Sequence, residues 1–382
     1  MLMDKSPPQQ VCTRCVMDTT VPEIRFDENG VCTYCRIHDD LEEKHPLDES
    51  GKRRFQAIID RIKRDGRGKE YDCIVGVSGG RDSSYTLYVA VEMGLRPLAV
   101  HFDNGWNSEI GVGNIKTITD TLNVDLHTHV ADWEEFKDIQ KAFLRASVSD
   151  AEVPTDYVIL SVLYHAATEN GVKYILNGHS FRTEGVAPIG WTYMDGRYIR
   201  GIQAKFGSAK ITSFPIMSLS ELLYYTFVKR IQVINVPEFI QYEHEHVNQV
   251  LEERLGWQYY GGHHHESVYT EFFQSYYLPQ KFNIDKRKLE YSALIRSGQM
   301  TREDALKELE KPYEYNPEIV DYTIAKLGLT PEEFREIMEE PARSFRDYPS
   351  YYSAIRASRV PIKIACNLNL LPHVFYEKYL GE

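Results

Sequence analysis

A strand, a glycine-rich turn and a helix follow one another early in this chain, and this order restricts the fold most. Asp72–Val77 predicts a buried strand, Ser78–Arg81 the turn and Ser83–Glu92 the helix. Three further strands and two helices are expected at Pro97–Phe102, Val124–Val130, Tyr174–Asn177, Ile110–Leu122 and Val158–Asn170. Apolar runs that alternate with helical segments are typical of a parallel sheet covered by helices. We therefore expect an α/β fold.

The two ends of the chain differ from this central pattern. Residues 1–50 contain five basic and eleven acidic residues, whereas 52–69 contain eight basic and two acidic residues. The change of sign predicts a small acidic module followed by a basic helix. From about Met217 the chain is expected to be mostly helical, because prolines divide it into short segments.

Charge and hydropathy exclude several classes of protein. The 382 residues include 44 Lys and Arg and 56 Asp and Glu, which gives a net charge of −12. A chain this acidic repels polyanions, so nucleic acid is not the expected partner. No apolar run of about 18 residues and no signal peptide is present, so we expect a cytoplasmic protein without a membrane span.

The turn Ser78-Gly79-Gly80-Arg81-Asp82-Ser83 has the composition of a phosphate site. Its glycines allow close approach of the backbone, and the following helix N-terminus favours an anion. Ser83 can cap that helix and also offer a hydroxyl. Phosphate is the predicted ligand of Ser78, Gly79, Gly80, Arg81, Asp82 and Ser83.

Three other motifs compete with this interpretation. No Walker A pattern occurs in the chain, and Gly111-Val112-Gly113 lacks the third glycine of a dinucleotide fingerprint, so a helix entry is expected there. Gly76-Val77-Ser78-Gly79-Gly80 satisfies the nucleophile-elbow pattern of α/β-hydrolases. That elbow normally follows several strands, whereas here it follows the first strand, and this position disfavours a hydrolase.

Four of the six cysteines are close together near the start of the chain. Cys12 and Cys15 form one Cys-x-x-Cys pair, and Cys32 and Cys35 form a second one sixteen residues later. This spacing predicts a structural Zn²⁺ site with four thiolates. An iron–sulfur cluster remains the alternative, because thiolates alone do not select the metal.

Histidine-rich stretches are weaker metal candidates. Adjacent residues in His263-His264-His265-Glu266 cannot all face one ion, so we expect no metal there. His244 and His246 lie in a charged helical stretch and are expected to be solvated.

The turn resembles the SGGxDS motif of the ATP-pyrophosphatase (PP-loop) superfamily, which cleaves ATP between its α and β phosphates. His101-Phe102-Asp103-Asn104-Gly105 is similar to the segment where those enzymes hold adenosine, and Asn177–Glu184, which includes Gly178, is similar to their third turn. The resemblance implies that Asp82 binds Mg²⁺, that Glu184 has a similar part, and that Asp103, Asn104 and Gly178 contact ATP. A carboxylate at a helix start is the alternative for Glu184.

Taken whole, the chain resembles the N-acetyl sugar amidotransferases of bacterial surface-polysaccharide pathways, which include WbpG and PseA. The resemblance rests on Val11–Thr20, the glycine turn, Glu266-Ser267, Phe272-Phe273-Gln274 and Ser297–Glu303. It implies a four-cysteine module over 1–50, a PP-loop domain over 51–260 and a helical region over 261–382. One departure is His263, where the family is expected to favour lysine. Lys281, Lys286 and Arg287 are anion contacts or, alternatively, solvated surface charges.

The implied reaction converts the acetamido group of a nucleotide-activated sugar to an acetamidino group, with ATP, Mg²⁺ and ammonia. Asp82, Ser78 and Ser83 would be the catalytic residues. Cys73 is expected in a buried strand and Cys366 in an apolar segment, so no glutaminase cysteine is evident. By resemblance, ammonia comes from a separate HisH-like glutaminase paired with a HisF-like barrel subunit. Phe272–Leu278 is either a docking or tunnel surface or, as we expect, helix core.

The alternative function is tRNA thiolation, because relatives that transfer sulfur to tRNA also carry paired cysteines. Those enzymes need a basic surface and usually a reactive cysteine in the loop domain. The acidic charge of this chain disfavours them.

Overall fold

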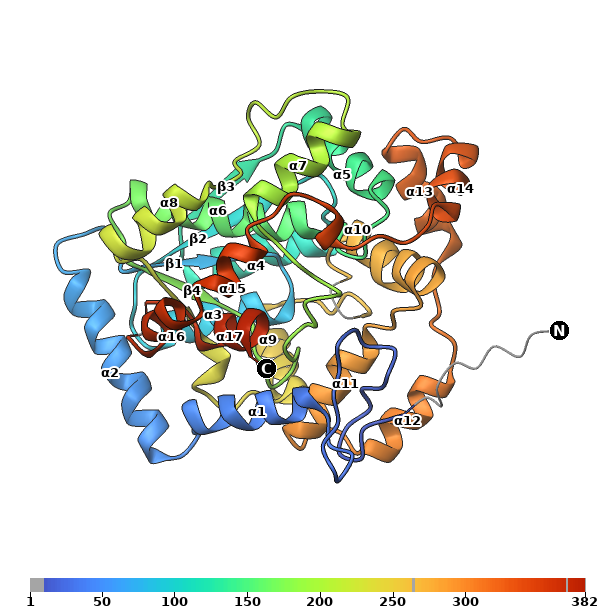
Figure 1. Ribbon diagram of the computed structural model, residues 1–382. Coiled ribbons are helices and arrows are strands. Elements are labelled where there is room, and N and C mark those ends of the chain that lie inside the picture. Colours follow the sequence, from blue (N-terminus) through green and yellow to red (C-terminus); the bar gives the residue numbers. More distant parts are fainter. Residues whose placement is uncertain (1–9, 263–264, 369, 382) are drawn as a thin grey trace.

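Five parallel strands form one sheet at the centre of the molecule (Figure 1). The computed structural model describes residues 10–262, 265–368 and 370–381. The strands are β1 (Cys73–Gly76), β2 (Pro97–Asp103), β3 (Leu126–Val130), β4 (Tyr174–Asn177) and β5 (Gln232–Asn235), in the spatial order β3-β2-β1-β4-β5. In the register, Ile74 of β1 lies between Leu98 of β2 and Ile175 of β4. The predicted α/β fold with a parallel sheet is confirmed.

The helices fall into three groups along the chain. The first two are α1 (Thr33–Lys44) and α2 (Glu49–Asp65). The sheet region contains α3 (Arg81–Glu92), α4 (Glu109–Leu122), α5 (Trp133–Arg145), α6 (Val153–Glu169), α7 (Gly196–Phe206), α8 (Leu219–Leu223) and α9 (His244–Leu255). The last group is α10 (Val268–Phe272), α11 (Arg287–Arg296), α12 (Arg302–Glu310), α13 (Pro317–Lys326), α14 (Pro331–Glu339), α15 (Tyr352–Ala357), α16 (Arg359–Asn367) and α17 (His373–Leu380). Two π-helices, Tyr224–Val228 and Phe273–Phe282, and two 3₁₀ turns, Val236–Glu238 and Phe345–Asp347, complete the structure.

Both faces of the sheet are covered, as β-strands that are apolar on both sides require. On one face, α2, α3, α4 and α9 bury Ile59, Leu87, Ile118 and Leu251 against β1 and β4. On the other face, α6 packs on β1, β2 and β4. Its core continues without a break into the four-cysteine module and the helices after residue 266. The helical character predicted for this last region is confirmed.

The order of the strands fixes where a ligand can bind. From β1 the chain moves to β2 and β3 on one side, and then returns to β4 and β5 on the other. The direction of the strand order therefore reverses between β1 and β4, and the carboxyl ends of the strands at such a reversal are where parallel α/β sheets commonly bind ligands. The glycine turn after β1 and the Asn177–Glu184 turn after β4 both lie at this point.

Strand β5 was not expected from the sequence. We expected mostly helix after about Met217, but Gln232–Asn235 pairs in parallel with Tyr174–Asn177. Only Ile234 and Asn235 of its four residues are buried, so the segment lacks the long apolar run that marks β1 and β2. Its position is set by the neighbouring strand rather than by its own composition.

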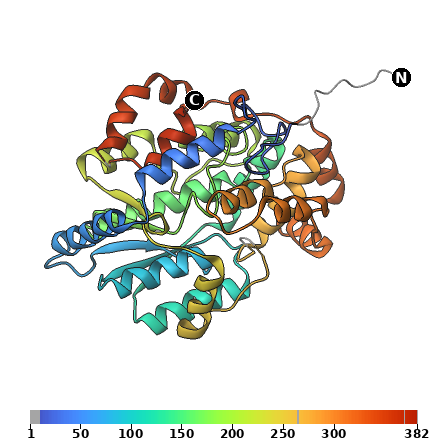
Figure 2. The same cartoon turned by 90° about the horizontal axis from the view of Figure 1, so that it is seen from below.

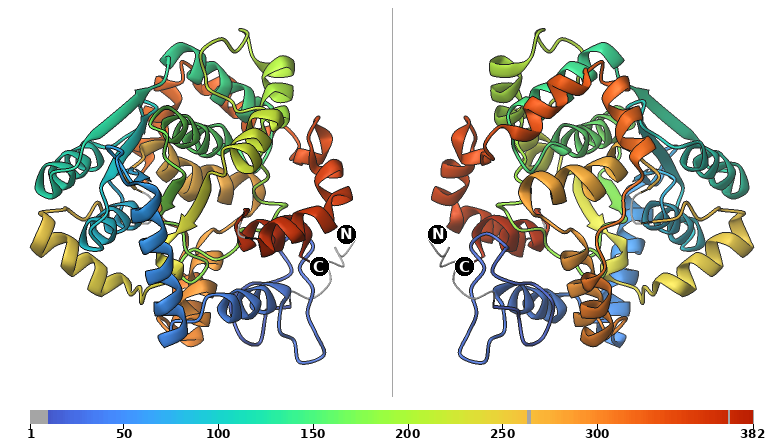
Figure 3. Two further views of the ribbon diagram at one scale, coloured as in Figure 1. Left: turned by 90° about the vertical axis from the view of Figure 1, so that its left-hand side faces the viewer. Right: turned by 90° about the vertical axis from the view of Figure 1, so that its right-hand side faces the viewer.

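The four-cysteine module packs against helices α11 and α12 (Figure 2). The Arg302 guanidinium donates to the carbonyl oxygens of Cys12 and Cys15, at 2.9 to 3.2 Å. Lys288 Nζ lies 2.6 Å from Asp18 Oδ2. Figure 3 shows the module also beside the last helices, where Lys44 Nζ of α1 lies 2.9 Å from Glu377 Oε1 of α17.

The aromatic stretch Phe272–Leu278 packs inward, which confirms the helix-core interpretation. Phe272, Phe273, Tyr277 and Leu278 are all at most 3% exposed.

Among the described helices, none combines the length and apolar character that crossing a bilayer needs.

Asp150 makes the stability of the core on the α6 side of the sheet depend on pH. Its carboxylate is buried and accepts hydrogen bonds from the Tyr198 hydroxyl at 2.7 Å and the Tyr193 amide at 3.3 Å. Burial raises the pKa of Asp150 to about 7. The folded chain therefore keeps a proton that the unfolded chain loses, so the free energy of unfolding should fall as the pH rises from about 4 to 7.

We expect Asp150→Asn to remove this pH dependence, which for the wild type is a loss of up to about 4 kcal/mol in the free energy of unfolding by neutral pH. Denaturant unfolding at pH 5 and pH 8 measures it, with Asp321→Asn at an exposed position as the control. Equal pH dependence in the wild type and the Asp150→Asn variant would contradict the assignment.

Candidate functional site

The backbone of the glycine turn passes close to the first turn of helix α4. Gly79 has a φ of +80°, and a Cβ there would lie 2.1 Å from the carbonyl oxygen of Gly111. A left-handed residue in such close contact has to be glycine. The Gly79 carbonyl accepts from Trp257 Nε1 at 2.9 Å and from Asn114 Nδ2 at 3.2 Å, which holds the turn in place.

Two serine hydroxyls face each other across this turn. Ser78 Oγ and Ser83 Oγ are 3.2 Å apart, and Ser83 Oγ accepts from the Ser78 amide at 3.1 Å. Ser78 Oγ accepts from the Gly80 amide and donates to Glu266 Oε1, both at 3.2 Å. Gly80 has no room for a side chain, because a Cβ would lie 2.5 Å from Glu266 Oε1. The turn thus combines amides, hydroxyls and a helix N-terminus, the donor set of an anion site.

Asp82 lies in the first turn of α3, where it contacts Arg81 and Tyr242. Arg81 Nε is 3.4 Å from Asp82 Oδ1, and the Tyr242 hydroxyl donates to the same oxygen. Burial and the Asp82 carboxylate raise the pKa of Tyr242 well above its ordinary value. Tyr242 therefore stays protonated and acts as a donor that orients the carboxylate.

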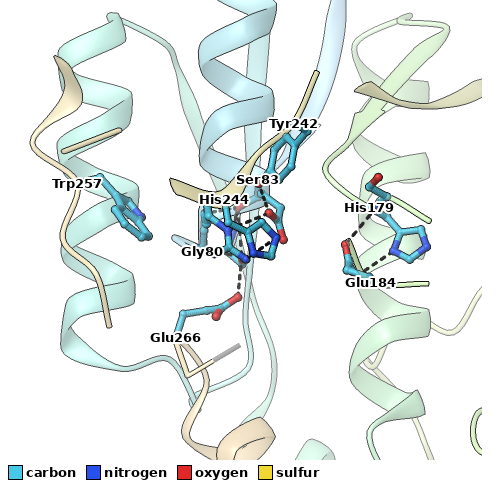
Figure 4. A network of polar contacts seen from close by, with 12 residues as sticks. Gly80, Ser83, His179, Glu184, Tyr242, His244, Trp257 and Glu266 are labelled. Atoms are coloured by element: carbon cyan, nitrogen blue, oxygen red, sulfur yellow. Dashed lines mark hydrogen bonds and ion pairs between the residues drawn. The ribbon is translucent and has the colours of Figure 1, made fainter. Parts of the chain in front are cut away.

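The prediction that His244 is solvated is wrong. Its Nε2 lies 3.1 Å from the guanidinium of Arg81, and Figure 4 shows the ring against the glycine turn. Burial, together with the neighbouring Arg81 charge, lowers the pKa of His244 to about 3, so the ring is neutral and accepts from Arg81. Gln299 fixes this segment, because it accepts from the His244 amide and donates to the Tyr242 carbonyl. His246 is exposed, as expected.

The turn after β4 comes directly against the start of α3. A Cβ on Gly178 would lie 2.7 Å from the backbone carbon and oxygen of Asp82 and 2.9 Å from the Ser83 amide nitrogen. Beyond it, Glu184 Oε2 lies 3.0 Å from His179 Nδ1, a pair that Figure 4 shows apart from the glycine turn. Burial lowers the pKa of His179, but the charge and hydrogen bond of Glu184 outweigh it, so the pKa is raised. Glu184 lies in a turn and not at a helix start.

This contact makes Gly178→Ala a direct test of the close approach between the turn after β4 and the start of α3. Backbone atoms cannot rotate away as a side chain can, so the methyl group should displace the start of α3 and lower the free energy of unfolding by about 1 to 3 kcal/mol. Phosphate binding should weaken with it. Gly113→Ala is the matched control, because a Cβ there meets nothing within 4 Å inside α4, and alanine should stabilise that helix by up to about 1 kcal/mol. Thermal unfolding of both variants measures the difference, and equal stability would contradict the close approach.

At the end of β2, the side chains of Asp103 and Asn104 shape the following turn. Asp103 Oδ1 accepts from the Gly105 amide at 2.9 Å, and Asn104 Oδ1 accepts from the Trp106 amide at 3.0 Å. His101 Nδ1 lies 2.9 Å from the carbonyl oxygen of Val77, which links this strand end to the glycine turn. Contact of Asp103 and Asn104 with adenosine stays a prediction.

Two of the three predicted anion contacts have other roles. Lys281 Nζ donates to the carbonyls of Ile337, Met338 and Glu340 and so caps the end of α14. Arg287 pairs with Asp285 at 2.7 Å. Neither is a solvated surface charge or an available anion contact, while Lys286 is half-buried at the start of α11. His263 and His264 lie outside the described residues, and His265 Nδ1 is 3.7 Å from Glu271.

The four cysteines meet in a cluster of the size of a single-metal site. All four Sγ atoms lie within 4.8 Å of one another, with 3.8 Å for Cys12–Cys35, 3.6 Å for Cys15–Cys32 and 3.7 Å for Cys32–Cys35. Zn–S bonds of about 2.3 Å in a tetrahedron place sulfur atoms about 3.8 Å apart. A cluster with several irons holds some of its thiolates farther apart, because the four cysteines are divided among different irons. The geometry therefore favours one ion.

Arg296 of α11 completes the surroundings of the cysteines. Its Nε lies 3.4 Å from Cys35 Sγ, and one terminal nitrogen lies 3.4 Å from Cys15 Sγ. Amides of Cys15 and Cys32 point at Cys12 Sγ. Four thiolates around a divalent cation carry a net charge of −2, so a guanidinium in contact with two of them stabilises the charged site.

The sequence did not predict several residues that contact the candidate site. Tyr242, His244, Trp257 and Tyr260 approach the glycine turn from a segment more than 150 residues away, and the Tyr260 hydroxyl accepts from the Arg81 amide. Their spacing follows no regular period. Glu266 is different, because it belongs to the Glu266-Ser267 motif and its contact with Ser78 gives that motif a position in the site.

Comparison with known proteins identifies the last part of the chain. Residues 266–360 match the family described as "LPS biosynthesis protein WbpG-like, C-terminal domain". The chain is 24% identical over 314 residues to the uncharacterized protein MJ1599 of Methanocaldococcus jannaschii, covering 79% of this chain and 93% of that protein.

Two solved structures are more distantly similar. An NMN synthetase from Francisella tularensis is 15% identical, with coverage of 76% of this chain and 92% of that one and a TM-score of 0.31. An NH₃-dependent NAD synthetase from Campylobacter jejuni is 13% identical, with coverage of 69% and 99% and a TM-score of 0.28. The fold assignment rests on the sheet itself and not on these distant likenesses.

The domain match begins at the residue whose carboxylate touches Ser78. Residues 266–360 are therefore similar to the WbpG-like C-terminal domain, which confirms the WbpG-like resemblance, and Glu266 of this segment contacts Ser78 of the glycine turn.

Proposed function

We propose that the chain is an ATP-dependent, AMP-forming amidotransferase that converts an acetamido group of a nucleotide-activated sugar to an acetamidino group. The observation that carries this proposal is the contact of Glu266, the first residue of the WbpG-like domain, with Ser78 in the glycine turn. It joins the domain that resembles sugar amidotransferases to a turn built for phosphate. Bacterial surface polysaccharide or flagellin glycan would be the destination of the product.

The reaction needs activation because an amide carbon is a poor electrophile. The amide oxygen attacks the α-phosphorus of ATP and forms an O-adenylyl imidate with release of pyrophosphate. Ammonia then attacks the imidate carbon and AMP leaves. In this proposal the turn amides, Ser78 and Ser83 bind the phosphates, and Arg81 offers a positive charge beside them. No covalent enzyme nucleophile is required.

The residues around the turn fit Mg²⁺. Two carboxylates belong to the surroundings of the glycine turn: Asp82 lies within it and accepts from the Tyr242 hydroxyl, and Glu266 accepts from Ser78 Oγ. Mg²⁺ in enzymes is usually held by one or two carboxylates together with phosphate oxygens, and when bound it neutralises the charge of the pyrophosphate. Asp82 would hold it, with Glu266 as the second carboxylate. Glu184 pairs with His179 and has a less direct part.

The need for ammonia implies that the protein has a partner that supplies it. Free ammonia is mostly ammonium at neutral pH and is then a poor nucleophile. Cys73 and Cys366 are both buried, and burial raises the pKa of each thiol, so neither suits a glutaminase. We therefore propose that a separate HisH-like glutaminase with a HisF-like barrel subunit supplies ammonia.

We expect the purified chain to form AMP only at high ammonium concentration, and to use glutamine only after these partners are added. Coupled measurement of AMP and glutamate tests this expectation. Robust glutamine-dependent activity of the chain alone would contradict it.

tRNA thiolation is the second candidate, and the cysteines argue against it. All six cysteines are buried, and four of them are together in the metal-site cluster. A sulfur relay needs a reactive, accessible thiol near the phosphate turn, and neither remaining cysteine provides one.

A further inference from the structure

A cavity of about 340 Å³ lies along the outer edge of the sheet, away from the glycine turn. Its walls are helix α2, the edge strand β5 with the 3₁₀ turn that follows it, and the residues that lead into α17. We call it the α2 cavity. Figure 1 shows α2 on the outside of the molecule, on the side where α16 and α17 lie. The volume falls within the range of small-ligand sites.

The α2 cavity is lined by an unusual concentration of positive charge. Arg54, Arg61 and Arg64 of the basic helix all border it. Spacings of seven and three residues place their side chains on one face of α2. Among the described residues that line the cavity, Glu238 is the only acidic one, and its Oε1 already accepts from Asn235 Nδ2 at 2.8 Å. In a chain with a net charge of −12, this wall is suited to an anion.

Two polar atoms of the lining residues lack partners. His45 is 6% exposed, and its Nδ1 has no hydrogen-bond partner among the described residues; the same holds for Nε of Arg61. The other ring nitrogen of His45 lies 3.5 Å from Glu238 Oε2. A buried polar atom without a partner costs free energy, which a hydrogen bond with a ligand can recover.

Apolar and aromatic side chains also line the cavity, beside the polar residues Gln232, Asn235 and His373. Ile58, Val233, Phe239 and Leu371 contribute to it, and Phe239 is stacked on Phe55 with ring centroids 5.4 Å apart. A bare inorganic anion would leave this surface uncovered. The complementary ligand therefore carries a phosphate group on a flat, less polar body.

We propose that the α2 cavity binds a phosphorylated ligand of nucleoside diphosphate size, with its phosphates against Arg54, Arg61 and Arg64 and its ring against Ile58 and Phe239. The inference rests on the cavity and not on the proposed reaction. Such a ligand is either the nucleotide part of the acceptor sugar or a separate nucleotide effector, which share this chemistry.

The test measures UDP binding to the full chain by calorimetry at about 0.15 M salt, with a non-hydrolysable ATP analogue occupying the glycine turn. We expect UDP to bind under these conditions. Arg61→Gln and Arg64→Gln should each weaken UDP binding by about tenfold or more, because each removes a charge-assisted hydrogen bond. Arg53→Gln is the matched control, since Arg53 is exposed on α2 and does not border the cavity. ATP-analogue affinity should not change in any of the three variants.

The outcomes separate the site from its alternatives. Equal weakening in Arg53→Gln and Arg61→Gln, or tight binding of tRNA without binding of UDP, would overturn the proposal and make α2 a general polyanion surface. A raised KM for the nucleotide sugar in Arg61→Gln would identify the acceptor as the ligand, and UDP binding with an unchanged KM would identify a separate effector. UDP binding is measured without turnover, so it tests the proposal for the α2 cavity even if the chain has no amidotransferase activity.

Discussion

Replacing Asp82 by alanine should lower AMP formation by at least about a hundredfold. Asp82 is the carboxylate within the glycine turn, and Tyr242 and Arg81 orient it. Removing it takes away the ligand proposed for Mg²⁺ and leaves the pyrophosphate charge without compensation. Steady-state AMP formation, with ATP and Mg²⁺ at saturation, measures the loss.

The matched variants are Asp82→Asn and Tyr242→Phe. Asn keeps the shape but not the charge, so it should lose nearly as much activity as alanine. Tyr242→Phe removes only the orienting donor, and it should cost less, about tenfold. Because Asp82 is half-buried at a helix start, thermal unfolding should change little in Asp82→Asn. Formation of ADP in place of AMP by the wild type would show that the turn does not cleave ATP between its α and β phosphates.

Loss of one metal-binding cysteine should have the largest effect on stability. We expect Cys12→Ser to lower the free energy of unfolding by more than about 3 kcal/mol, because binding of a structural metal is coupled to local folding. Cys12 is 0% exposed, and the Arg302 guanidinium also contacts its backbone. Elemental analysis of the wild type should give about one zinc per chain. Cys12→Ser should reduce this content.

Cys366→Ala is the control for this experiment, since Cys366 is equally buried but lies outside the cluster. Its zinc content should match the wild type. Iron with visible charge-transfer absorption in place of zinc would contradict the structural zinc site and would strengthen the thiolation alternative.

The local elements of the fold were predictable because each has its own sequence signal. Strand β1, the glycine turn and α3 follow from an apolar run and two glycines, and the structure places them within one or two residues of the prediction. The expectation that Ser83 caps α3 is wrong, because the helix begins at Arg81, its N-cap is Gly80 and no side chain caps it. The cysteine cluster was equally predictable, because a spacing of two residues allows only a few geometries. Binding of phosphate and of zinc stays a prediction in both cases.

Long-range contacts could not be predicted in the same way. Tyr242 reaches Asp82 across 160 positions, and no period in the sequence connects them. His244 looked solvated because its helix is highly charged, yet Arg81 and Gln299 enclose it. Lys281 and Arg287 looked like anion contacts because their charges were visible, while the carbonyls and the Asp285 carboxylate that bind them were not. In each case the tertiary environment decides the role of a side chain.

One measurement tests the proposed function most directly. The chain is incubated with ATP, Mg²⁺, a high concentration of ammonium and a panel of nucleotide-activated acetamido sugars, and the products are analysed by mass spectrometry. The account predicts AMP in a one-to-one ratio with a sugar in which one oxygen has been replaced by NH. AMP formation that is independent of every acetamido sugar, or that requires tRNA and a sulfur donor, would contradict it.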